Sequence, residues 1–263
     1  MKGALELDKY TGFATVYDMS MEHIPYDEWA NYIEKILKEH GIGKGLILEL
    51  GCGTGNMTRK MADKGYDMIG IDYSEEMLTI ARQRSEDRGD NILYLCQDMR
   101  DFELYGTVSA IICVCDSINY MLNEDDLSKV FRLASNYLDP HGLLIFDMDT
   151  EYLYEEVLGD NTTYTNHEAG GFIWENNFYP DDMINEVNLT LYIKEADSDI
   201  FSKHEETHVR RAYKVDTIKR LLHEANLDFV AAYHELTEEQ PRPESERIYI
   251  IAKERHQSNK LYI

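Results

Sequence analysis

The chain has 263 residues, a length that suits one large domain or one and a half domains. Hydrophobic residues make up 43% of it, enough to bury a core. Its formal net charge of −24 at pH 7 argues against a nucleic-acid-binding surface, which relies on clustered Lys and Arg, so DNA is not expected as a partner. No apolar run reaches the roughly 18 residues that span a bilayer, and the first residues lack the apolar core of a signal peptide, so we expect a soluble, cytoplasmic protein.

The first predicted element is an N-terminal cap over residues 1–40, which begins with an aromatic stretch. Tyr10, Phe13, Tyr17 and Tyr26 lie close together in the sequence. Apolar residues then recur at helical spacing and predict an amphipathic helix that ends near His40. They are Trp29, Ile33, Ile36 and Leu37. On these residues alone, the aromatic side chains form a hydrophobic plug.

A buried strand followed by a glycine-rich turn is the clearest ligand-binding signal in the chain. The apolar run Leu46–Leu50 predicts a parallel strand, and the glycines within Gly51–Gly55 predict a tight turn that a ligand can approach closely. A helix expected from Thr54 to about Lys64 would direct its first N–H groups at a negative ligand group. Asn56 stands where a dinucleotide fingerprint needs glycine, and the turn lacks the Lys of a phosphate loop.

The next predicted strand ends in an acid. Tyr66–Ile71 reads as a buried strand, and Asp72 follows it about 20 residues beyond the glycines, where a carboxylate accepts hydrogen bonds from ribose hydroxyls. Ser74 is the expected N-cap of the helix that comes next. A third strand is predicted over Ile92–Cys96.

The motif E-x-G-x-G-x-G at Glu49–Gly55, with Asp72 after the next strand, resembles the first two motifs of the class I S-adenosylmethionine (SAM)-dependent methyltransferases. This resemblance implies that the glycines lie against the methionine part of SAM and that Asp72 holds its ribose. It also implies that Asp98 binds the adenine amino group while the backbone of Met99 contacts the ring. The candidate cofactor-binding residues are Glu49, Gly51, Cys52, Gly53, Gly55, Asp72, Tyr73, Met77, Asp98, Met99 and Cys115.

The loop Cys115–Tyr120, after a fourth predicted strand at Val108–Val114, is expected to face the reacting methyl group. Ligands bind outside the carboxyl ends of the central strands in open α/β sheets. The loop lacks the Asn-Pro-Pro-Tyr or Asp-Pro-Pro-Tyr sequence with which amino-methyltransferases of DNA bases hold an amine. That substrate class is therefore not expected.

A helix and a fifth strand complete this half of the chain. Asn123 is the expected N-cap of the helix, which Pro140 and Gly142 end. The strand is predicted over Leu143–Phe146 and leads to Asp147–Asp149.

The pattern changes after Thr150, where we expect a short helix and then an inserted antiparallel sheet within residues 151–213. Its clearest strand is 183–194, in which apolar and polar residues alternate. His204 and His208 fall in another strand, where four residues span about 13 Å, too far for one metal ion. The four cysteines lack metal-binding spacing, so no metal site is expected.

Alternating helix and strand patterns resume at Val215 and end with strands at Phe229–Leu236 and Ile248–Lys253. We therefore expect an α/β fold in which residues 1–150 and 214–263 form a Rossmann-like domain. The family resemblance implies a seven-stranded, mostly parallel sheet of order 3-2-1-4-5-7-6, whose last strand is antiparallel.

A second, looser resemblance is to small-molecule N-methyltransferases of the glycine and amino-sugar type, in which such an inserted sheet roofs the substrate pocket. It rests on the segments Asp147–Thr150, Phe172–Asn176 and His208–Tyr213. Family members often carry Asn where Asp149 stands, which leaves the role of this residue open.

The class I resemblance also gives the N-terminal segment a role. A segment similar to Phe13–Asp18 caps SAM in the family and carries tyrosines into the active site, which implies positions near the methyl group for Tyr17 and Tyr10. A sulfonium is a cation, for which an aromatic face or a tyrosine oxygen is a suitable neighbour.

Methyl transfer requires donor and acceptor to be collinear in a dry pocket, and it requires a base only when the acceptor is a protonated amine or a hydroxyl. The candidate catalytic residues are His208, Asp116 and Tyr17, with Asp149 as a further candidate base. The candidate substrate-binding residues are Tyr10, Tyr120, Asp149, Trp174 and Arg211. Structural explanations stay open for His208 as a half-buried strand residue, Arg211 in a surface ion pair and Trp174 in packing.

The sequence therefore indicates a SAM-dependent methyltransferase that acts on a small molecule at nitrogen, as a monomer or homodimer. The alternatives within enzymes are an O- or carboxyl-methyltransferase and one that modifies RNA or protein. A catalytically silent SAM-binding module is the alternative outside enzymes.

Overall fold

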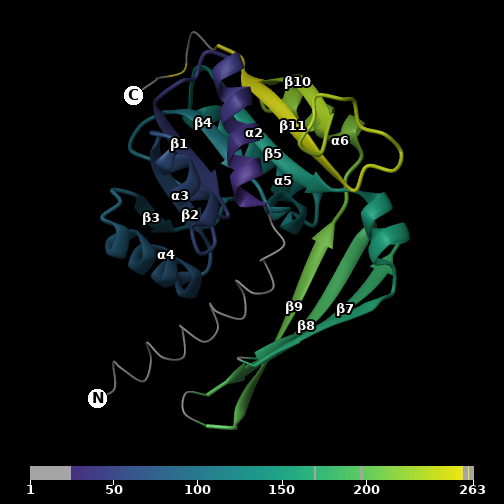
Figure 1. The fold of residues 1–263 in the computed structure, drawn as a ribbon. Helices are drawn as coiled ribbons and strands as arrows, with labels where there is room; N and C mark the ends of the chain where they lie inside the picture. Colours follow the sequence, from purple (N-terminus) through teal and green to yellow (C-terminus); the bar gives the residue numbers. More distant parts are fainter. Residues whose placement is uncertain (1–24, 169, 196–197, 257–259, 261–263) are drawn as a thin grey trace.

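The computed structural model describes residues 25–168, 170–195, 198–256 and 260, and contains a seven-stranded sheet and a separate four-stranded sheet (Figure 1). The larger sheet has the strand order β10-β11-β5-β4-β1-β2-β3. Its strands are β1 Leu46–Leu50, β2 Asp67–Asp72, β3 Leu93–Cys96, β4 Val108–Cys113, β5 Leu138–Asp149, β10 Leu227–His234 and β11 Arg247–Glu254. Strands β1 to β5 are parallel, and β11 is antiparallel to both β5 and β10. The expected topology is thus confirmed.

Helices cover both faces of this sheet. They are α2 Tyr26–Glu39, α3 Asn56–Asp63, α4 Glu75–Arg88, α5 Glu124–Tyr137 and α6 Val215–Glu224. Apolar residues of α2 and α3 share one buried cluster with Ile47, whereas those of α5 and α6 share another with Leu48. Successive residues of a strand point to opposite faces. Helices α2 and α3 therefore pack on one face of the sheet, and α5 and α6 on the other. Within the described residues, no helix is long and apolar enough to cross a membrane.

Two expected N-caps are confirmed. The Ser74 hydroxyl accepts a hydrogen bond from the N–H of Met77 at 3.2 Å, and Asn123 Oδ1 accepts one from the N–H of Asp126 at 2.8 Å. Each side chain satisfies a backbone donor that the first helical turn leaves without a partner.

Strand β5 begins five residues earlier than the sequence predicts, at Leu138 rather than Leu143. Pro140 and Gly142 therefore lie inside the strand, and α5 ends before them at Tyr137. The pairing with β4 shifts register at this point, which marks a bulge. A bulge accommodates a proline that a regular ladder would exclude.

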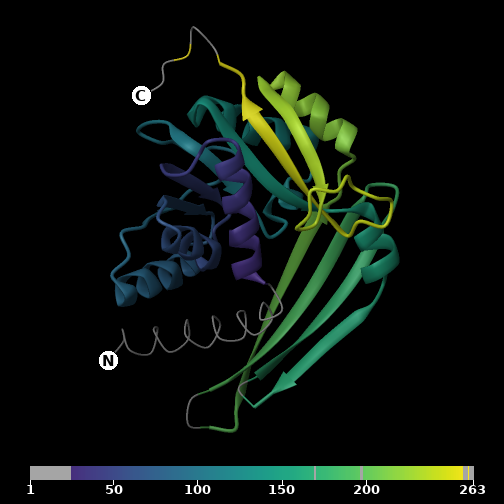
Figure 2. The same cartoon turned by 45° about the horizontal axis from the view of Figure 1, so that its top comes forward.

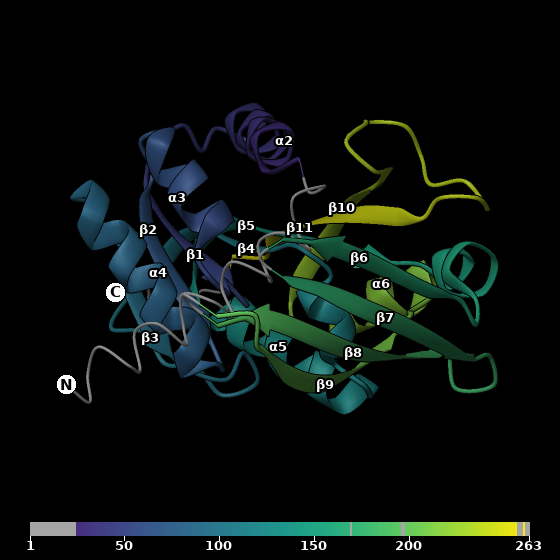
Figure 3. The same cartoon turned by 60° about the horizontal axis from the view of Figure 1, so that its bottom comes forward.

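The inserted sheet forms an arm that projects from the larger sheet (Figures 1 and 2). A π-helix, η2 Leu153–Leu158, precedes it, where a short helix was expected. The strands β6 Thr162–His167, β7 Gly170–Tyr179, β8 Ile184–Lys194 and β9 Phe201–Arg211 are all antiparallel and lie side by side in this order (Figure 3). The alternation expected in β8 is confirmed, since Val187, Leu189, Leu191 and Ile193 are buried. His204 and His208 lie in a strand, as predicted.

One buried side chain ties the arm to the larger sheet. Asn119 lies in the 3₁₀ turn η1, Ser117–Tyr120, directly after β4. Its Nδ2 donates to the carbonyl oxygens of Asp149 at 3.1 Å and Arg211 at 2.8 Å, and its Oδ1 accepts from the N–H of Asp149 at 3.0 Å. The ends of β5 and β9 are thereby fixed against the loop that follows β4.

Candidate active site

The glycine turn between β1 and α3 has an open face at Gly53. Gly51 and Gly53 have φ angles of +70° and +52°, in the left-handed region that favours glycine. A Cβ atom at Gly51 would lie 2.7 Å from Ser117 Oγ, so this end of the turn packs closely on the loop after β4. A Cβ atom at Gly53 would meet nothing within 4 Å. The backbone of Gly53 therefore borders open space that a ligand can enter.

Asp72 is hydrogen-bonded to the same turn. Its Oδ2 accepts from the N–H of Gly53 at 2.7 Å and its Oδ1 from the N–H of Ser74 at 2.8 Å. A carboxylate oxygen accepts more than one hydrogen bond, so Asp72 retains capacity for ribose hydroxyls. Burial raises the pKa of its carboxyl group, while the backbone donors oppose that rise. Tyr73 is exposed beside it, and Met77 is half-buried in the first turn of α4.

Three other residues of the motif face the protein interior. Glu49 accepts a hydrogen bond from the hydroxyl of Thr58 in α3, and burial raises the pKa of its carboxyl group to about 8. A Cβ atom at Gly70 would lie 2.9 Å from Cys52 Sγ, so this thiol occupies the space that Gly70 leaves. Gly55 packs against the side chain of Tyr94 in the same way. The side chains of Glu49 and Cys52 thus support the turn from behind.

The two residues expected at the adenine lie after β3 in different settings. The carboxylate of Asp98 is paired with Arg100, whose Nε lies 3.0 Å from each of its oxygens. This guanidinium lowers the pKa of Asp98. Met99 Cε would lie 3.4 Å from a Cβ atom at Gly51, so its side chain reaches the glycine turn. An adenine amino group bound by Asp98 would therefore share the carboxylate with Arg100.

The loop after β4 is held in an unusual conformation by a buried acid. Cys115 and Asp116 have φ angles of 60° and 51°, which cost non-glycine residues free energy. The carboxylate of Asp147, at the end of β5, accepts the N–H groups of Cys115 at 3.2 Å and of Asp116 at 2.9 Å. Charge-assisted hydrogen bonds of this kind offset the conformational cost. Asp147 therefore fixes the direction of the Asp116 side chain.

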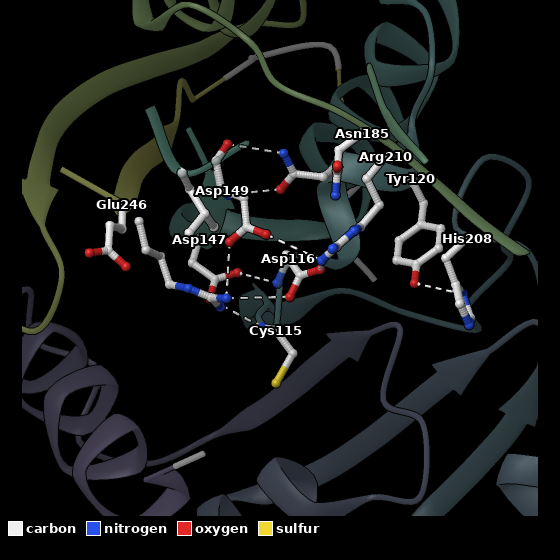
Figure 4. Close-up of polar contacts among 12 residues, drawn as sticks. Cys115, Asp116, Tyr120, Asp147, Asp149, Asn185, His208, Arg210 and Glu246 are labelled. Atoms are coloured by element: carbon white, nitrogen blue, oxygen red, sulfur yellow. Dashed lines mark hydrogen bonds and ion pairs between the residues drawn. The ribbon is translucent and has the colours of Figure 1, made fainter. Parts of the chain in front are cut away.

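Five charged side chains from four segments meet beside this loop (Figure 4). We call Asp116, Asp147, Asp149, Arg210 and Arg247 the carboxylate–arginine cluster. Arg210 Nη1 lies 2.6 Å from Asp116 Oδ2 and 3.3 Å from Asp149 Oδ2. Arg247 Nη1 lies 2.7 Å from Asp147 Oδ2, and its Nη2 lies 3.0 Å from Asp149 Oδ1 and 3.4 Å from Asp116 Oδ1. With every group ionised, the cluster has a net charge of −1.

Burial changes the protonation of this cluster. Asp147 and Asp149 are almost completely buried. Burial, followed by the neighbouring Asp116 carboxylate, raises the pKa of Asp149 to about 7. Burial also raises the pKa of Asp147, against the influence of Arg247. Asp149 therefore lies near its titration point at neutral pH.

A side chain of the turn after β4 meets a side chain of the arm. The hydroxyl of Tyr120, in η1, lies 3.0 Å from His208 Nδ1, in β9, and the two rings meet edge to face (Figure 4). His208 Nε2 lies 3.2 Å from Glu206 Oε2. The structure thus brings together two residues that the sequence singled out separately.

The arginine named from the sequence is not in the carboxylate–arginine cluster. Arg211 Nη1 donates to the carbonyl oxygen of Leu122 at 3.0 Å, and its guanidinium lies over the ring of Tyr213. The neighbouring Arg210 faces the cluster instead, because successive strand residues point to opposite faces. Trp174 donates from Nε1 to Asn176 Oδ1 at 3.1 Å, and its ring lies 5.8 Å from the Arg210 guanidinium.

Two candidates remain, and four residues that were not candidates also lie at the site. Tyr10 and Tyr17 lie outside the described residues. Four further residues contact other candidates in ways that the sequence did not reveal: Arg210, Arg247, Asp147 and Glu206. Of these, Arg247 had a usable signal: it opens the last strand, and an antiparallel last strand places its first residue at the carboxyl end of β5.

The residues at this edge of the sheet fit SAM. Gly53 offers open space along the backbone, and Asp72 offers acceptor oxygens to ribose hydroxyls. The Asp116 carboxylate suits a neighbouring sulfonium cation. Within the described residues, no group of His, Cys, Asp and Glu side chains is arranged to hold a metal ion.

Comparison with known proteins agrees with this fit. The family model for the methyltransferase domain matches residues 47–142, which contain the glycine turn, Asp72 and Asp116. The chain is 34% identical to a protein of Bacillus subtilis (strain 168) named as a methyltransferase, YqeM, over 92% of this chain and 96% of that relative. The crystal structure of a SAM-dependent methyltransferase from Clostridium acetobutylicum ATCC 824 has a TM-score of 0.84 and 28% identity, covering 94% of this chain and 99% of that one.

A third similarity covers less of the chain. The sequence is 29% identical to the dTDP-3-amino-3,6-dideoxy-alpha-D-glucopyranose N,N-dimethyltransferase of Streptomyces fradiae over 46% of each protein. The similarity to YqeM extends over nearly the whole of both chains, and the fold and the glycine turn agree with it. The chain therefore belongs to the SAM-dependent methyltransferases, and SAM is its methyl donor.

Proposed function

We propose that this enzyme transfers the methyl group of SAM to a nitrogen atom of a small-molecule amine that carries no carboxylate close to the amine. The observation that carries this proposal is the charge of the carboxylate–arginine cluster. Its two guanidiniums are already paired with three carboxylates, so the cluster has no unpaired positive charge for an anionic acceptor and carries a net charge of −1 when Asp149 is ionised. Such a site attracts a cationic amine and repels an anionic acceptor.

Each part of the chain has a distinct role in this proposal. The glycine turn and Asp72 bind SAM, which supplies an electrophilic methyl group on a positively charged sulfur. Asp116, held by Asp147, faces the reacting atoms, and the inserted sheet of residues 151–213 roofs the acceptor. Holding the acceptor nitrogen in line with the methyl group in a dry pocket supplies most of the rate enhancement. The similarity to an enzyme that is named for an amino-sugar substrate supports nitrogen as the acceptor atom.

An amine that arrives protonated must lose a proton before its lone pair can attack. His208 is our candidate for the group that accepts this proton, because its ring lies beside the loop after β4, with Nδ1 3.0 Å from the Tyr120 hydroxyl. Asp116 and Asp149 are the other candidates within the described residues.

Binding and turnover measurements test the proposal together. Calorimetric titration with S-adenosylhomocysteine should show affinity lowered about 10- to 100-fold in Asp72→Ala, the effect of losing hydrogen bonds to a charged group. Asp67→Ala is the matched control, because Asp67 is exposed at the opposite end of the same strand. Unchanged affinity in Asp72→Ala would remove this residue from the SAM site.

Turnover then separates an enzyme of amines from the alternatives. Pools of small amines, hydroxy compounds and carboxylic acids are incubated with SAM, and release of S-adenosylhomocysteine is measured. Release with amine pools alone is expected. Release with hydroxy compounds or acids would assign the enzyme to oxygen acceptors, and tight binding without turnover in any pool would indicate a silent SAM-binding module.

A further inference from the structure

Tyr120, His208 and Glu206 make a connected path from the loop after β4 to the exposed edge of the inserted sheet. Resting on amine methylation as proposed above, we propose that these three residues form a proton relay in which the Tyr120 hydroxyl, rather than the His208 ring, meets the acceptor nitrogen. His208 takes the proton from Tyr120, and Glu206 is a positioning residue that orients His208.

The place of Tyr120 follows from the turn that carries it. In a 3₁₀ helix, side chains at positions i and i+3 lie one above the other. Ser117 begins η1, and its hydroxyl lies 3.5 Å from the carbonyl oxygen of Gly51 in the glycine turn. Tyr120 stands three residues later and therefore projects from the same side of η1, the side that faces the glycine turn. The far end of the path is open, since the side chains of His208 and Glu206 are 29% and 39% exposed.

Hydrogen bonding selects the tautomer that a relay requires. Glu206 is a carboxylate and can only accept, so His208 Nε2, at 3.2 Å, carries the ring proton. The lone pair of Nδ1 then points to the Tyr120 hydroxyl, 3.0 Å away. Tyr120 is 41% exposed, so an acceptor can reach its hydroxyl. A hydroxyl, an imidazole and a carboxylate in this order form the arrangement that activates nucleophiles in many enzymes.

The strand pairing places Glu206 and His208 on the correct face. Glu206 and His208 pair with Leu189 and Val187, which are buried residues of β8. Glu205 lies one residue earlier and points to the opposite face, where Lys203 pairs with it at 2.7 Å. Glu206 is therefore the acid of β9 that can orient His208.

The step balances in atoms and charge. The acceptor ammonium gives one proton to the Tyr120 oxygen as Tyr120 gives its own proton to His208 Nδ1, so the tyrosine ends unchanged. The freed nitrogen lone pair forms the new C–N bond, and the C–S bond breaks with its electron pair left on sulfur, which becomes a neutral thioether. The imidazolium of His208 is stabilised by Glu206 and returns its proton to solvent.

Nitrogen-15 NMR of the full-length chain tests the geometry without any acceptor. The ring nitrogens of His208 are assigned by their loss in His208→Ala. We expect Nε2 to carry the proton in the wild type and this preference to be lost in Glu206→Leu. Glu206→Gln, which keeps an acceptor oxygen, and Glu205→Leu, on the opposite face, should both retain it. A proton on Nδ1 in the wild type, or an unchanged tautomer in Glu206→Leu, would refute the relay.

Kinetic measurements with an amine that the wild type methylates test whether catalysis uses the relay. Tyr120→Phe and His208→Ala should lower kcat about 100-fold or more, the usual contribution of positioned proton transfer, with unchanged affinity for S-adenosylhomocysteine. Glu206→Leu should give a smaller loss that Glu206→Gln partly rescues. Wild-type kcat in Tyr120→Phe would overturn the relay and leave amine methylation standing. Failure of the wild type to methylate any amine would instead overturn the proposed function, and the NMR result alone would then decide the geometry.

Discussion

Replacement of Arg210 with Met should destabilise the protein strongly, because this guanidinium joins the inserted sheet to the loop after β4. Arg210 is 7% exposed, and its Nη1 lies 2.6 Å from Asp116 and 3.3 Å from Asp149. Removing one partner of a buried ion pair typically costs about 3–5 kcal/mol, because a buried charge is left uncompensated. Arg247 still contacts both carboxylates, which places the expected loss near 3 kcal/mol, the lower end of that range.

Arg211→Met is the matched control, one residue along the same strand. Its guanidinium makes one hydrogen bond to the Leu122 carbonyl oxygen and lies over the ring of Tyr213. A hydrogen bond from a charged group contributes about 1.5–3 kcal/mol and an exposed cation–π contact about 0.5–1 kcal/mol. Arg211 is only half-buried, which places their sum near the lower end, at about 2 kcal/mol. Both substitutions keep a long apolar side chain, so the comparison isolates the charge and its partners.

Urea unfolding, followed by circular dichroism at pH 7.5 and extrapolated to water, gives the two free energies of unfolding. Arg210→Met should lose at least about 1 kcal/mol more than Arg211→Met. Equal losses, or a variant Arg210→Met as stable as the wild type, would refute the reasoning that Arg210 neutralises buried carboxylates.

Three further predictions test other parts of the structure. Asp149→Asn should flatten the pH dependence of stability. Burial raises the pKa of Asp149 from 3.8 to about 7, so between these pH values the folded protein binds more protons than the unfolded chain. The wild type therefore loses stability as pH rises through this range, and the variant lacks this loss. Equal losses of unfolding free energy between pH 5 and pH 7.5 in variant and wild type would contradict this. Gly53 and Gly89 both have a positive φ and no atom within 4 Å of an added Cβ. Gly53→Ala and Gly89→Ala should therefore each lower the free energy of unfolding by about 1 kcal/mol. Calorimetry should show weaker S-adenosylhomocysteine binding in Gly53→Ala alone, and equal affinity in both would count against the open face. Asn119→Ala should lower the free energy of unfolding by about 3 kcal/mol, because three hydrogen bonds between the Asn119 side chain and the backbone are lost, two of them buried. A loss below about 1 kcal/mol in urea would show that water replaces them.

The glycine turn and the acid beside it could be predicted from the sequence because their determinants are local. The strand Leu46–Leu50 is observed with the predicted bounds, and the glycine turn and Asp72 follow directly from residue types at fixed spacing. Glycine is required where φ is positive, and an acid at the end of the second strand must lie beside the first turn in a parallel sheet. The helix caps Ser74 and Asn123 were predictable for the same local reason.

The carboxylate–arginine cluster depends on pairings between distant segments, which periodicity does not determine. Strand β9 carries polar residues on both faces, so its pattern does not tell which of Arg210 and Arg211 faces the crevice. The register with β8 decides this, because Arg210 pairs with the buried Asn185. Arg247 reaches Asp147 only because β11 pairs antiparallel with β5. The early start of β5 depends likewise on a bulge against β4.

The fate of the methyl group tests the central claim most directly. The chain is incubated with SAM labelled with carbon-13 at the methyl group and with a panel of small amines, and the products are followed by carbon-13 NMR. We predict a labelled methyl group bonded to nitrogen, formed in equal amount to S-adenosylhomocysteine. A label bonded to oxygen, or SAM binding without any labelled product across the panel, would contradict the proposal that this chain methylates amines at nitrogen.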